Sequence, residues 1–314
     1  MGRPSCSREE YIDIFRSVGA EEAARRLGIS VRQAHRRRAD IERDLGITLL
    51  SPSSTTRVPV IEYPHRLKDK VHDGVILVGS DMHYRPGLIT TAHRGLVKFA
   101  KTLKPKIVVA NGDVMDFPTI SRHAPIGWEK HPKVSEEIET AVERMGELEM
   151  AYPKARRVWS LGNHDARFET RLATQAPEYA NVHGMHLKDT FPHWEPCWSI
   201  WINEEVVIKH RFKGGIHATH NNTMWAGKTV VTGHLHSLKV TPFSDYNGTR
   251  WGVDTGTLAE PYGPAFVDYT EDGPKNWRSG FVVLTFRGGR LMWPEIASVV
   301  EEGVIDFRGE AISV

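Results

Sequence analysis

The chain has 314 residues, 40% of them hydrophobic and 25% charged, as in an ordinary soluble globular protein of about two domains. Its apolar runs are far shorter than the ~20 residues that cross a bilayer, and its N-terminus lacks the apolar core of a secretory signal, so we expect a cytoplasmic protein without membrane contact. The two cysteines, Cys6 and Cys197, form no CxxC pair, so any metal must be held by His, Asp or Asn. A net charge of +2 does not by itself indicate nucleic-acid binding.

The first part of the chain is predicted to be helical. Apolar residues recur there at helical spacing, and glycines at positions 19, 28 and 46 interrupt or end the pattern. The predicted helices cover residues 9–18, 20–27 and 31–45. Ser30 can cap the third helix after the Gly28 turn, and two helices joined in this way resemble the helix-turn-helix family of DNA-binding modules. The residues that carry the resemblance are Ala23, Gly28, Ile29 and Val31.

The third of these helices carries four arginines and one histidine between residues 31 and 38, with no acid among them. In a helix-turn-helix this helix enters a DNA groove, so we expect it to contact phosphates and base edges. The residues expected to bind nucleic acid are Arg32, His35, Arg36 and Arg37. A three-helix bundle used for protein contacts or dimerisation is the alternative, and it stays open. Because one such module binds weakly, a homo-oligomer or a second contact is expected.

Residues 48–72 lose this periodicity and are rich in Ser, Thr and Pro, so we predict a linker between an N-terminal module (1–47) and a second domain (73–314). From residue 74 buried strands alternate with helices, and after about residue 197 the pattern is strand-rich. This order predicts an α/β domain with two stacked mixed β-sheets flanked by helices, preceded by the small all-α domain. The last segment, 290–314, fits either a pair of strands or a tail.

Five short polar motifs end or directly follow predicted strands of the second domain. At the carboxyl ends of strands, loops bring distant residues together and hold them rigidly. Two divalent ions about 3.5–4 Å apart need a shared anionic ligand such as Asp113, with His and oxygen ligands on either side. We expect two such ions, with Mn²⁺ preferred and Fe, Zn²⁺ or Ni²⁺ as alternatives. The motifs are Asp81-Met-His83, Gly112-Asp113-Val-Met-Asp116, Gly162-Asn163-His164-Asp165, His210 and Gly233-His234-Leu-His236.

In this order the motifs resemble those of the calcineurin-like metallophosphoesterase superfamily, whose pattern is DxH, GDxxD, GNH[DE], H and GHxH. The resemblance extends over about residues 74–290, and the helical N-terminus resembles phage- or prophage-encoded members. It implies a four-layer sandwich in which a hydroxide bridging the two ions attacks phosphorus. It also implies one ion held by Asp81, His83, Asp113 and His236, and a second held by Asp113, Asn163, His210 and His234.

The same resemblance implies roles for residues beside the ions. His164 is expected to stand next to the scissile phosphate and to protonate the leaving oxygen or stabilise charge. Asp116 and Asp165 are expected to orient His side chains. Arg167, just after the third motif, and His123, after the second, are candidates for binding the substrate, Arg167 by holding a phosphate and His123 by covering the site. A structural loop residue is the alternative for each.

The fourth motif departs from the family pattern. The family often has His next to Gly there, whereas this chain reads Lys209-His210-Arg211. His217 and His220 lie just downstream and are competing candidates. His210 is favoured because it ends an apolar run, while the other two lie in a segment of helical character.

Three functions fit these residues. The first joins both halves of the chain: a phosphodiesterase or nuclease that the N-terminal module brings to DNA. The second is a phosphomonoesterase acting on a phosphoprotein or a nucleotide, because the same metal cluster serves monoesters and diesters. The third is a non-catalytic DNA-binding regulator, which the complete set of ligands disfavours.

Overall fold

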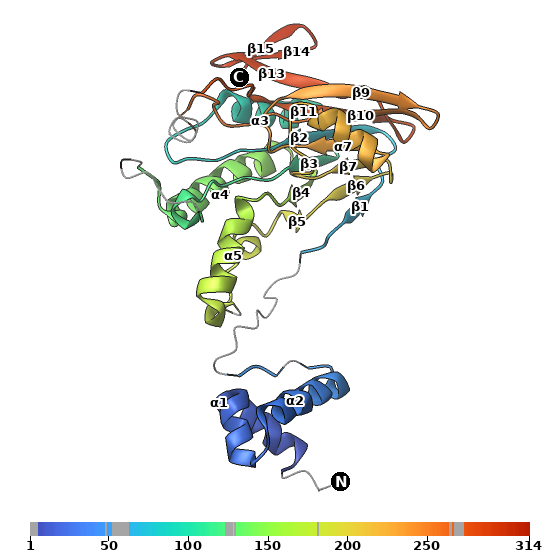
Figure 1. Cartoon of the computed structure of the whole chain (residues 1–314). Helices are drawn as coiled ribbons and strands as arrows, with labels where there is room; N and C mark the ends of the chain where they lie inside the picture. Colours follow the sequence, from blue (N-terminus) through green and yellow to red (C-terminus); the bar gives the residue numbers. More distant parts are fainter. Residues whose placement is uncertain are drawn as a thin grey trace. The chain divides into compact units, whose positions relative to one another are not determined.

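The computed structural model describes residues 6–47, 49–51, 63–122, 128, 130–180, 182–263, 266 and 273–314 of the chain (Figure 1). The chain divides into two units, Met1–Pro59 and Val60–Val314. His123, one of the predicted substrate contacts, lies outside the described residues. Among the helices of the described part, none combines the length and the apolar character that crossing a membrane requires.

Unit 1 is the expected small all-α module, built from α1 (Arg8–Leu27) and α2 (Val31–Leu45). Gly19 has a φ of 80°, which glycine adopts without strain, and it divides α1 into the two helical segments predicted from the sequence. Each helix starts with a capping box, in which the Ser7 or Ser30 side chain accepts a hydrogen bond from the third helical residue. The helices enclose a core of Tyr11, Phe15, Ile41 and Leu49.

Unit 2 contains two β-sheets and most of the helices of the described chain. The strands of the first sheet are β1 (Leu67–Asp69), β6 (Ile200–Ile202), β7 (Val206–Ile208), β8 (Thr229–Thr232), β9 (Lys239–Asp245) and β10 (Gly248–Asp254). Those of the second are β2 (Gly74–Gly79), β3 (Ile107–Ala110), β4 (Arg156–Ser160), β5 (Glu195–Cys197), β11 (Gly280–Arg287), β12 (Arg290–Leu291), β13 (Glu295–Glu301), β14 (Val304–Phe307) and β15 (Glu310–Ser313). The helices are α3 (Thr91–Leu103), α4 (Val134–Ala151), α5 (Asp165–Gln175), α6 (Leu187–Thr190) and α7 (Ala218–Ala226).

Both sheets mix parallel and antiparallel pairs. The first has the strand order β1-β6-β7-β8-β10-β9, and the second has the order β15-β14-β13-β11-β2-β3-β4-β5, with β12 beside β11. Apolar side chains of both sheets, such as Val109 and Val231, form one buried cluster, so the sheets stack face to face (Figure 1). A second cluster joins β2, β3 and β4 to α3 and α4, while α7 packs on β8, β9 and β10. The predicted α/β architecture of two stacked sheets flanked by helices is confirmed.

Part of the segment predicted as a linker, 48–72, belongs to unit 2. Leu67–Asp69 forms β1, which pairs in parallel with β6 at the edge of the first sheet. Tyr63 and Val71, on either side of it, are buried. The strand could not be predicted from the sequence, because three residues on a sheet edge are too few to show a periodicity.

The C-terminal segment, for which the sequence left a strand pair or a tail open, extends the second sheet. Strands β13, β14 and β15 add to β11 as successive antiparallel neighbours. Ile305 of β14 is fully buried and packs in the same cluster as α3. This part of the chain therefore completes the core rather than forming a tail.

The packing of α7 on its sheet gives a test of the fold. A Cβ built on Gly252 of β10 would lie 1.8 Å from the Thr219 carbonyl oxygen, so Gly252→Ala must displace α7, and we expect it to lower the free energy of unfolding by about 1–3 kcal/mol. Gly146→Ala is the control, because no atom lies within 4 Å of a Cβ built there in α4, and it should raise stability by about 1 kcal/mol. Thermal unfolding followed by circular dichroism measures both, and an unchanged Tm for Gly252→Ala would contradict this packing.

Candidate metal centre

The motifs noted in the sequence follow strands that lie side by side. They come directly after β2, β3 and β4, which are parallel neighbours, and after β7 and β8 of the other sheet. Several motif residues have left-handed backbone conformations, which non-glycine residues keep only where the surrounding structure enforces them. They are Asp81 (φ 51°), His83 (φ 40°), Asp113 (φ 52°), His234 (φ 71°) and His236 (φ 56°).

Three groups of side chains among the described residues could hold a metal ion, and two of them consist only of expected ligands. The remaining one joins His83 to Asp116 and His164. Within each of the two groups of expected ligands, one ligand atom from each residue lies within 4.8 Å of the others. The first group consists of Asp81, His83 and His236, and the second of Asp113, His210 and His234. The His236 Nε2 atom is 2.9 Å from Asp81 Oδ1, and the His210 Nε2 atom is 3.1 Å from Asp113 Oδ2. Each group corresponds to one of the two ion sites that the motifs imply.

Buried atoms without hydrogen-bond partners show that these residues fit metal ions. Asn163 Oδ1, His83 Nε2 and His236 Nδ1 are buried, and none of them has a hydrogen-bond partner among the described residues. Polar atoms left unpaired in a protein interior are costly, so few are found without a ligand that explains them. These three atoms belong to residues that the motifs assign as ligands, although other buried side chains, such as Ser160 and Thr285, also have unpaired atoms.

His210 supports the same conclusion through its tautomer. Its Nδ1 donates a hydrogen bond to the Asn111 carbonyl oxygen at 2.8 Å, so in the neutral ring the lone pair of Nε2 faces the Asp113 carboxylate. Two electron-rich atoms at this distance require a positive charge beside them. Either a proton or a metal ion supplies it, and the two compete because imidazole binds metal only after losing its proton.

The electrostatics of the centre favour bound cations. Asp81 and Asp113 are 0% and 1% exposed. Burial opposes ionisation of Asp81, but His236 and His210 outweigh it and hold the pKa at about 2. Burial likewise opposes the charge on His210, but Asp113 and Asp81 raise its pKa to about 10. The buried carboxylates therefore stay ionised and attract positive charge strongly.

His164 lies beside both groups and is oriented by Asp116. Its Nδ1 donates a hydrogen bond to the Asp116 carboxylate at 2.6 Å, and its Nε2 lies 3.7 Å from Asp113 Oδ2. Burial favours the neutral ring, but the Asp113 and Asp116 carboxylates outweigh it and raise the pKa of His164. Arg167 lies next to it, with Nη1 donating to the Asp116 carbonyl oxygen at 2.8 Å and Nη2 3.3 Å from His164 Nε2. The site thus contains two side chains suited to stabilise negative charge on a substrate.

Asp165 does not orient a histidine, and this part of the sequence interpretation is wrong. The carboxylate is fully buried and accepts only backbone and indole N–H groups among the described residues. Its donors are Asp113, Val114, Gly162 and Trp159. Asp165 therefore ties the loop after β4 to the loop after β3 and fixes the backbone of Asp113. Asp165 follows His164 in the sequence, but this does not show which hydrogen-bond donors lie beside its carboxylate in the fold.

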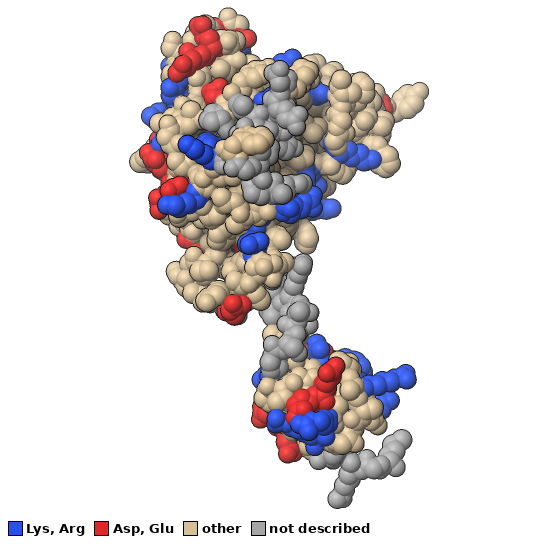
Figure 2. Space-filling model, turned by 60° about the vertical axis from the view of Figure 1, so that its left-hand side comes forward, with Lys and Arg blue, Asp and Glu red and all other residues tan. Residues whose placement is uncertain are grey.

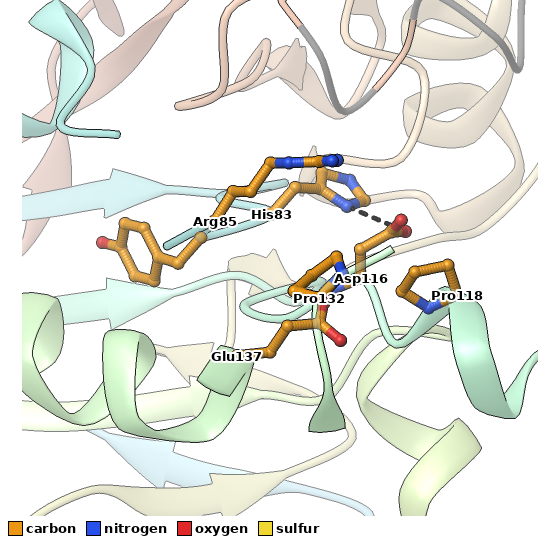
Figure 3. A pocket seen from close by; sticks show the side chains of 7 residues that line it. His83, Arg85, Asp116, Pro118, Pro132 and Glu137 are labelled. Atoms are coloured by element: carbon orange, nitrogen blue, oxygen red, sulfur yellow. Dashed lines mark hydrogen bonds and ion pairs between the residues drawn. The ribbon is translucent and has the colours of Figure 1, made fainter. Parts of the chain in front are cut away.

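Glu137 of α4 supports the site and was missed in the sequence, where it is one of many acids between residues 136 and 149. Its Oε1 accepts hydrogen bonds from the backbone N–H groups of Asp116 at 3.2 Å and Phe117 at 2.9 Å. It lines a small pocket with His83 and Arg85, and the His83 ring points toward the Asp116 carboxylate there (Figure 3). Glu137 therefore holds the turn that carries Asp116.

The two competing histidines of the fourth motif lie elsewhere. His217 directly precedes α7, and His220 lies within it, where its ring packs against Phe243 with 5.4 Å between centroids. Neither joins a group of candidate ligands among the described residues. The geometry therefore favours His210.

The expected nucleic-acid contacts lie on α2 of unit 1. On this unit Arg side chains are interspersed with Asp and Glu (Figure 2). Arg37 is half-buried and donates to the Cys6 carbonyl oxygen at 2.7 Å, with its guanidinium 4.8 Å from the centroid of the Tyr11 ring. It is thus engaged in packing the module. The other three are exposed, with no hydrogen-bond or ion-pair partner among the described residues: Arg32, His35 and Arg36.

Close packing at Gly162 gives a test of the metal centre. A Cβ built there would lie 2.0 Å from Asp113 Oδ1, so Gly162→Ala must displace the carboxylate that both ion sites are expected to share. We expect metal affinity to fall by roughly 10- to 100-fold, as it does when supporting residues of metal sites are removed. Isothermal titration with Mn²⁺ measures this, with Gly146→Ala as a control of unchanged affinity. Equal affinity in both variants would contradict the assignment of Asp113.

Glu137 gives a test by pH. Burial raises its pKa to about 7, from an ordinary value of 4.5. As the pH rises from 4.5 to about 7 the unfolded chain releases this proton before the folded one, so the free energy of unfolding falls by up to about 3 kcal/mol. In Glu137→Gln the side-chain oxygen still accepts hydrogen bonds, but the side chain does not titrate. The free energy of unfolding of the variant should therefore rise relative to that of the wild type between pH 5 and pH 8. Urea unfolding at pH 5 and pH 8 measures the free energy of unfolding of both proteins. A difference between variant and wild type that is the same at both pH values would contradict a protonated, buried Glu137.

Comparison with known proteins agrees with this centre. Residues 74–249 match the calcineurin-like phosphoesterase family. The gene 54 protein of Mycobacterium phage L5 is 27% identical over 239 residues, which cover 66% of this chain and 87% of that protein. The gene 54 protein of Mycobacterium phage D29 is 26% identical over 234 residues, with the same coverage. These relatives agree with the resemblance to phage-encoded members.

Likeness to solved structures is weaker. A structure described as a novel archaeal phosphodiesterase has a TM-score of 0.37 and 14% identity, covering 71% of this chain and 99% of its own. Vps29 of Chaetomium thermophilum has a TM-score of 0.40 and 8% identity, and the match covers 76% of this chain and 95% of Vps29. Neither similarity supports a conclusion about function. The family match, by contrast, covers more than half of the chain and contains all five motifs. The chain therefore belongs to the calcineurin-like phosphoesterases and is a metal-dependent phosphoesterase.

Proposed function

We propose that this phosphoesterase is a phosphodiesterase that cleaves DNA, and that unit 1 contributes to DNA binding. The proposal specifies a substrate, which the family does not, because the same metal cluster serves monoesters and diesters.

The metal centre supports the hydrolytic step. We assign Asp81, His83, Asp113 and His236 to one ion and Asp113, Asn163, His210 and His234 to the other, with Mn²⁺ as the metal. Divalent ions held there supply Lewis-acid activation of a phosphoryl group and of water. His164 donates a proton to the leaving oxygen, and Asp116 holds its ring in place through the 2.6 Å hydrogen bond to Nδ1.

The observation that carries the choice of DNA is the exposed basic side of α2. Arg32 and Arg36 find no acidic partner among the described residues, although other arginines of unit 1, such as Arg25, pair with Glu or Asp. Unpaired cations on an exposed helix attract phosphates, and their counter-ion release makes binding depend on salt. The charge is small, so unit 1 adds affinity to a substrate that the metal centre also binds.

The first experiment compares two small substrates. Metal-stripped protein is assayed with Mn²⁺ restored on bis-p-nitrophenyl phosphate and on p-nitrophenyl phosphate. We expect the diester to be hydrolysed faster, and His164→Ala to lower its kcat by roughly 100-fold or more, as loss of a general acid does. Dominant monoester hydrolysis would contradict the diesterase proposal. It would favour a phosphomonoesterase acting on a phosphoprotein or a nucleotide.

A second measurement isolates the contribution of unit 1. Double-stranded DNA binding is followed by fluorescence anisotropy over a range of salt concentrations, in the wild type and in Arg32→Gln with Arg36→Gln. We expect weaker binding and a salt slope lower by roughly 2, about one unit for each lost phosphate contact. An unchanged slope would show that α2 does not bind DNA, and unit 1 would then serve protein contacts.

A further inference from the structure

A long stretch of unit 2 next to the metal centre has no acidic residue. Between Glu205 and Asp245 the sequence contains neither Asp nor Glu, although the whole chain has 39 of them. The same stretch contains three of the assigned metal ligands, His210, His234 and His236. Its basic residues are Lys209, Arg211, Lys213, Lys228 and Lys239. A one-sided excess of positive charge beside a catalytic centre attracts an anionic substrate.

Large aromatic side chains are exposed among these cations. Trp225 near the end of α7 is 67% exposed, and Phe212, two residues after His210, is 44% exposed. Arg211 and Lys213, on either side of Phe212, are exposed too. We call this set the basic–aromatic strip, and it consists of Lys209, Arg211, Phe212, Lys213 and Trp225.

The cations of the strip are not neutralised by acids. No carboxylate of the described residues lies within ion-pair distance of Lys209, Arg211 or Lys213. The lysines lie against aromatic rings instead, with Lys209 Nζ 5.1 Å from the centroid of Phe212 and Lys213 Nζ 3.2 Å from that of Trp225. Cation–π contacts at exposed sites contribute only about 0.5–1 kcal/mol, so these lysines can turn toward a phosphate at small cost.

The strip begins at the metal centre itself. Lys209 and Arg211 flank His210 in the chain, and the His210 carbonyl oxygen accepts a hydrogen bond from Gly233 at 2.8 Å, next to His234. The strip is also held in place beyond this point. The buried Asn222 side chain accepts a hydrogen bond from the Lys213 backbone N–H at 3.0 Å, and Lys239 donates to the Ile216 carbonyl oxygen at 2.8 Å. Its position relative to the centre is therefore defined by the fold.

We propose that the basic–aromatic strip binds a single strand of the DNA substrate and leads it to the metal centre. Arg211 and Lys213 contact the phosphates, and Phe212 and Trp225 stack on bases. This inference rests on the proposed function and adds to it the form of the substrate. In a duplex the bases stack on one another and do not present their faces, whereas alternating cations and exposed rings suit a single strand.

The test uses the full chain with Mn²⁺ bound and a fluorescent single-stranded oligonucleotide as the probe. Trp225→Ala is expected to weaken binding by roughly 5- to 100-fold, the range for loss of one stacked base, while Trp225→Phe keeps most of the affinity. Lys213→Gln is expected to lower the salt slope of binding by about 0.7, the value for one phosphate of a single strand. The matched controls are Tyr179→Ala and Lys68→Gln, an exposed ring and an exposed lysine outside the strip, and neither should change binding.

Kinetics separate the strip from the metal centre. The ratio of kcat/KM on the oligonucleotide to kcat/KM on bis-p-nitrophenyl phosphate should fall in Trp225→Ala, because only the oligonucleotide has further nucleotides that extend along the strip to Trp225. Equal losses on both substrates would mean that the substitution disturbs the metal centre and would overturn the proposal. Single-strand binding that is unchanged in both Trp225→Ala and Lys213→Gln would overturn it as well.

The two proposals fail in different ways. Oligonucleotide binding that depends on Trp225 and Lys213, without any cleavage, would refute the nuclease function and support the strip. Cleavage of the oligonucleotide that neither substitution weakens would support the nuclease function and refute the strip.

Discussion

The burial of two carboxylates at neighbouring strand ends is the constraint on which the rest of unit 2 depends. Asp81 and Asp113 are almost completely excluded from water, and like charges in such a place are tolerated only with compensating positive charge. Imidazoles from both sheets supply part of it, and unpaired ring and amide atoms around them are suited to divalent ions. Stacking the two sheets is what brings His210 and His236 to the carboxylates.

Supporting residues keep this arrangement in place at a cost in backbone strain. Five motif residues have a positive φ, and their conformations persist because hydrogen bonds from elsewhere hold the loops. Asp165 accepts hydrogen bonds from backbone N–H groups of the loops after β3 and β4. Glu137 accepts them from the N–H groups of Asp116 and Phe117, at the end of the second motif. The position of His164 therefore depends on acids that hold the backbone of the surrounding loops.

Family membership establishes the reaction class, while the choice of substrate depends on surfaces outside the metal ligands. Two such surfaces carry unpaired cations: the exposed side of α2 in unit 1 and the basic–aromatic strip beside His210. The first suits the phosphates of a duplex and the second a single strand with accessible bases. We therefore propose that the two surfaces together serve an enzyme that acts on DNA in which part of a strand is unpaired.

The sequence by itself determined the strand and helix order, the all-α N-terminus and the identity of the motif residues, because buried strands, helix caps and strand-end polar residues are local patterns. Tertiary structure decided what depends on contacts between distant segments. It placed β1 within the predicted linker, favoured His210 over His217 and His220, engaged Arg37 inside unit 1, and gave Asp165 backbone partners instead of a histidine. The physical reason is that a polar side chain takes the partner that the fold brings to it, and sequence neighbours do not specify that partner.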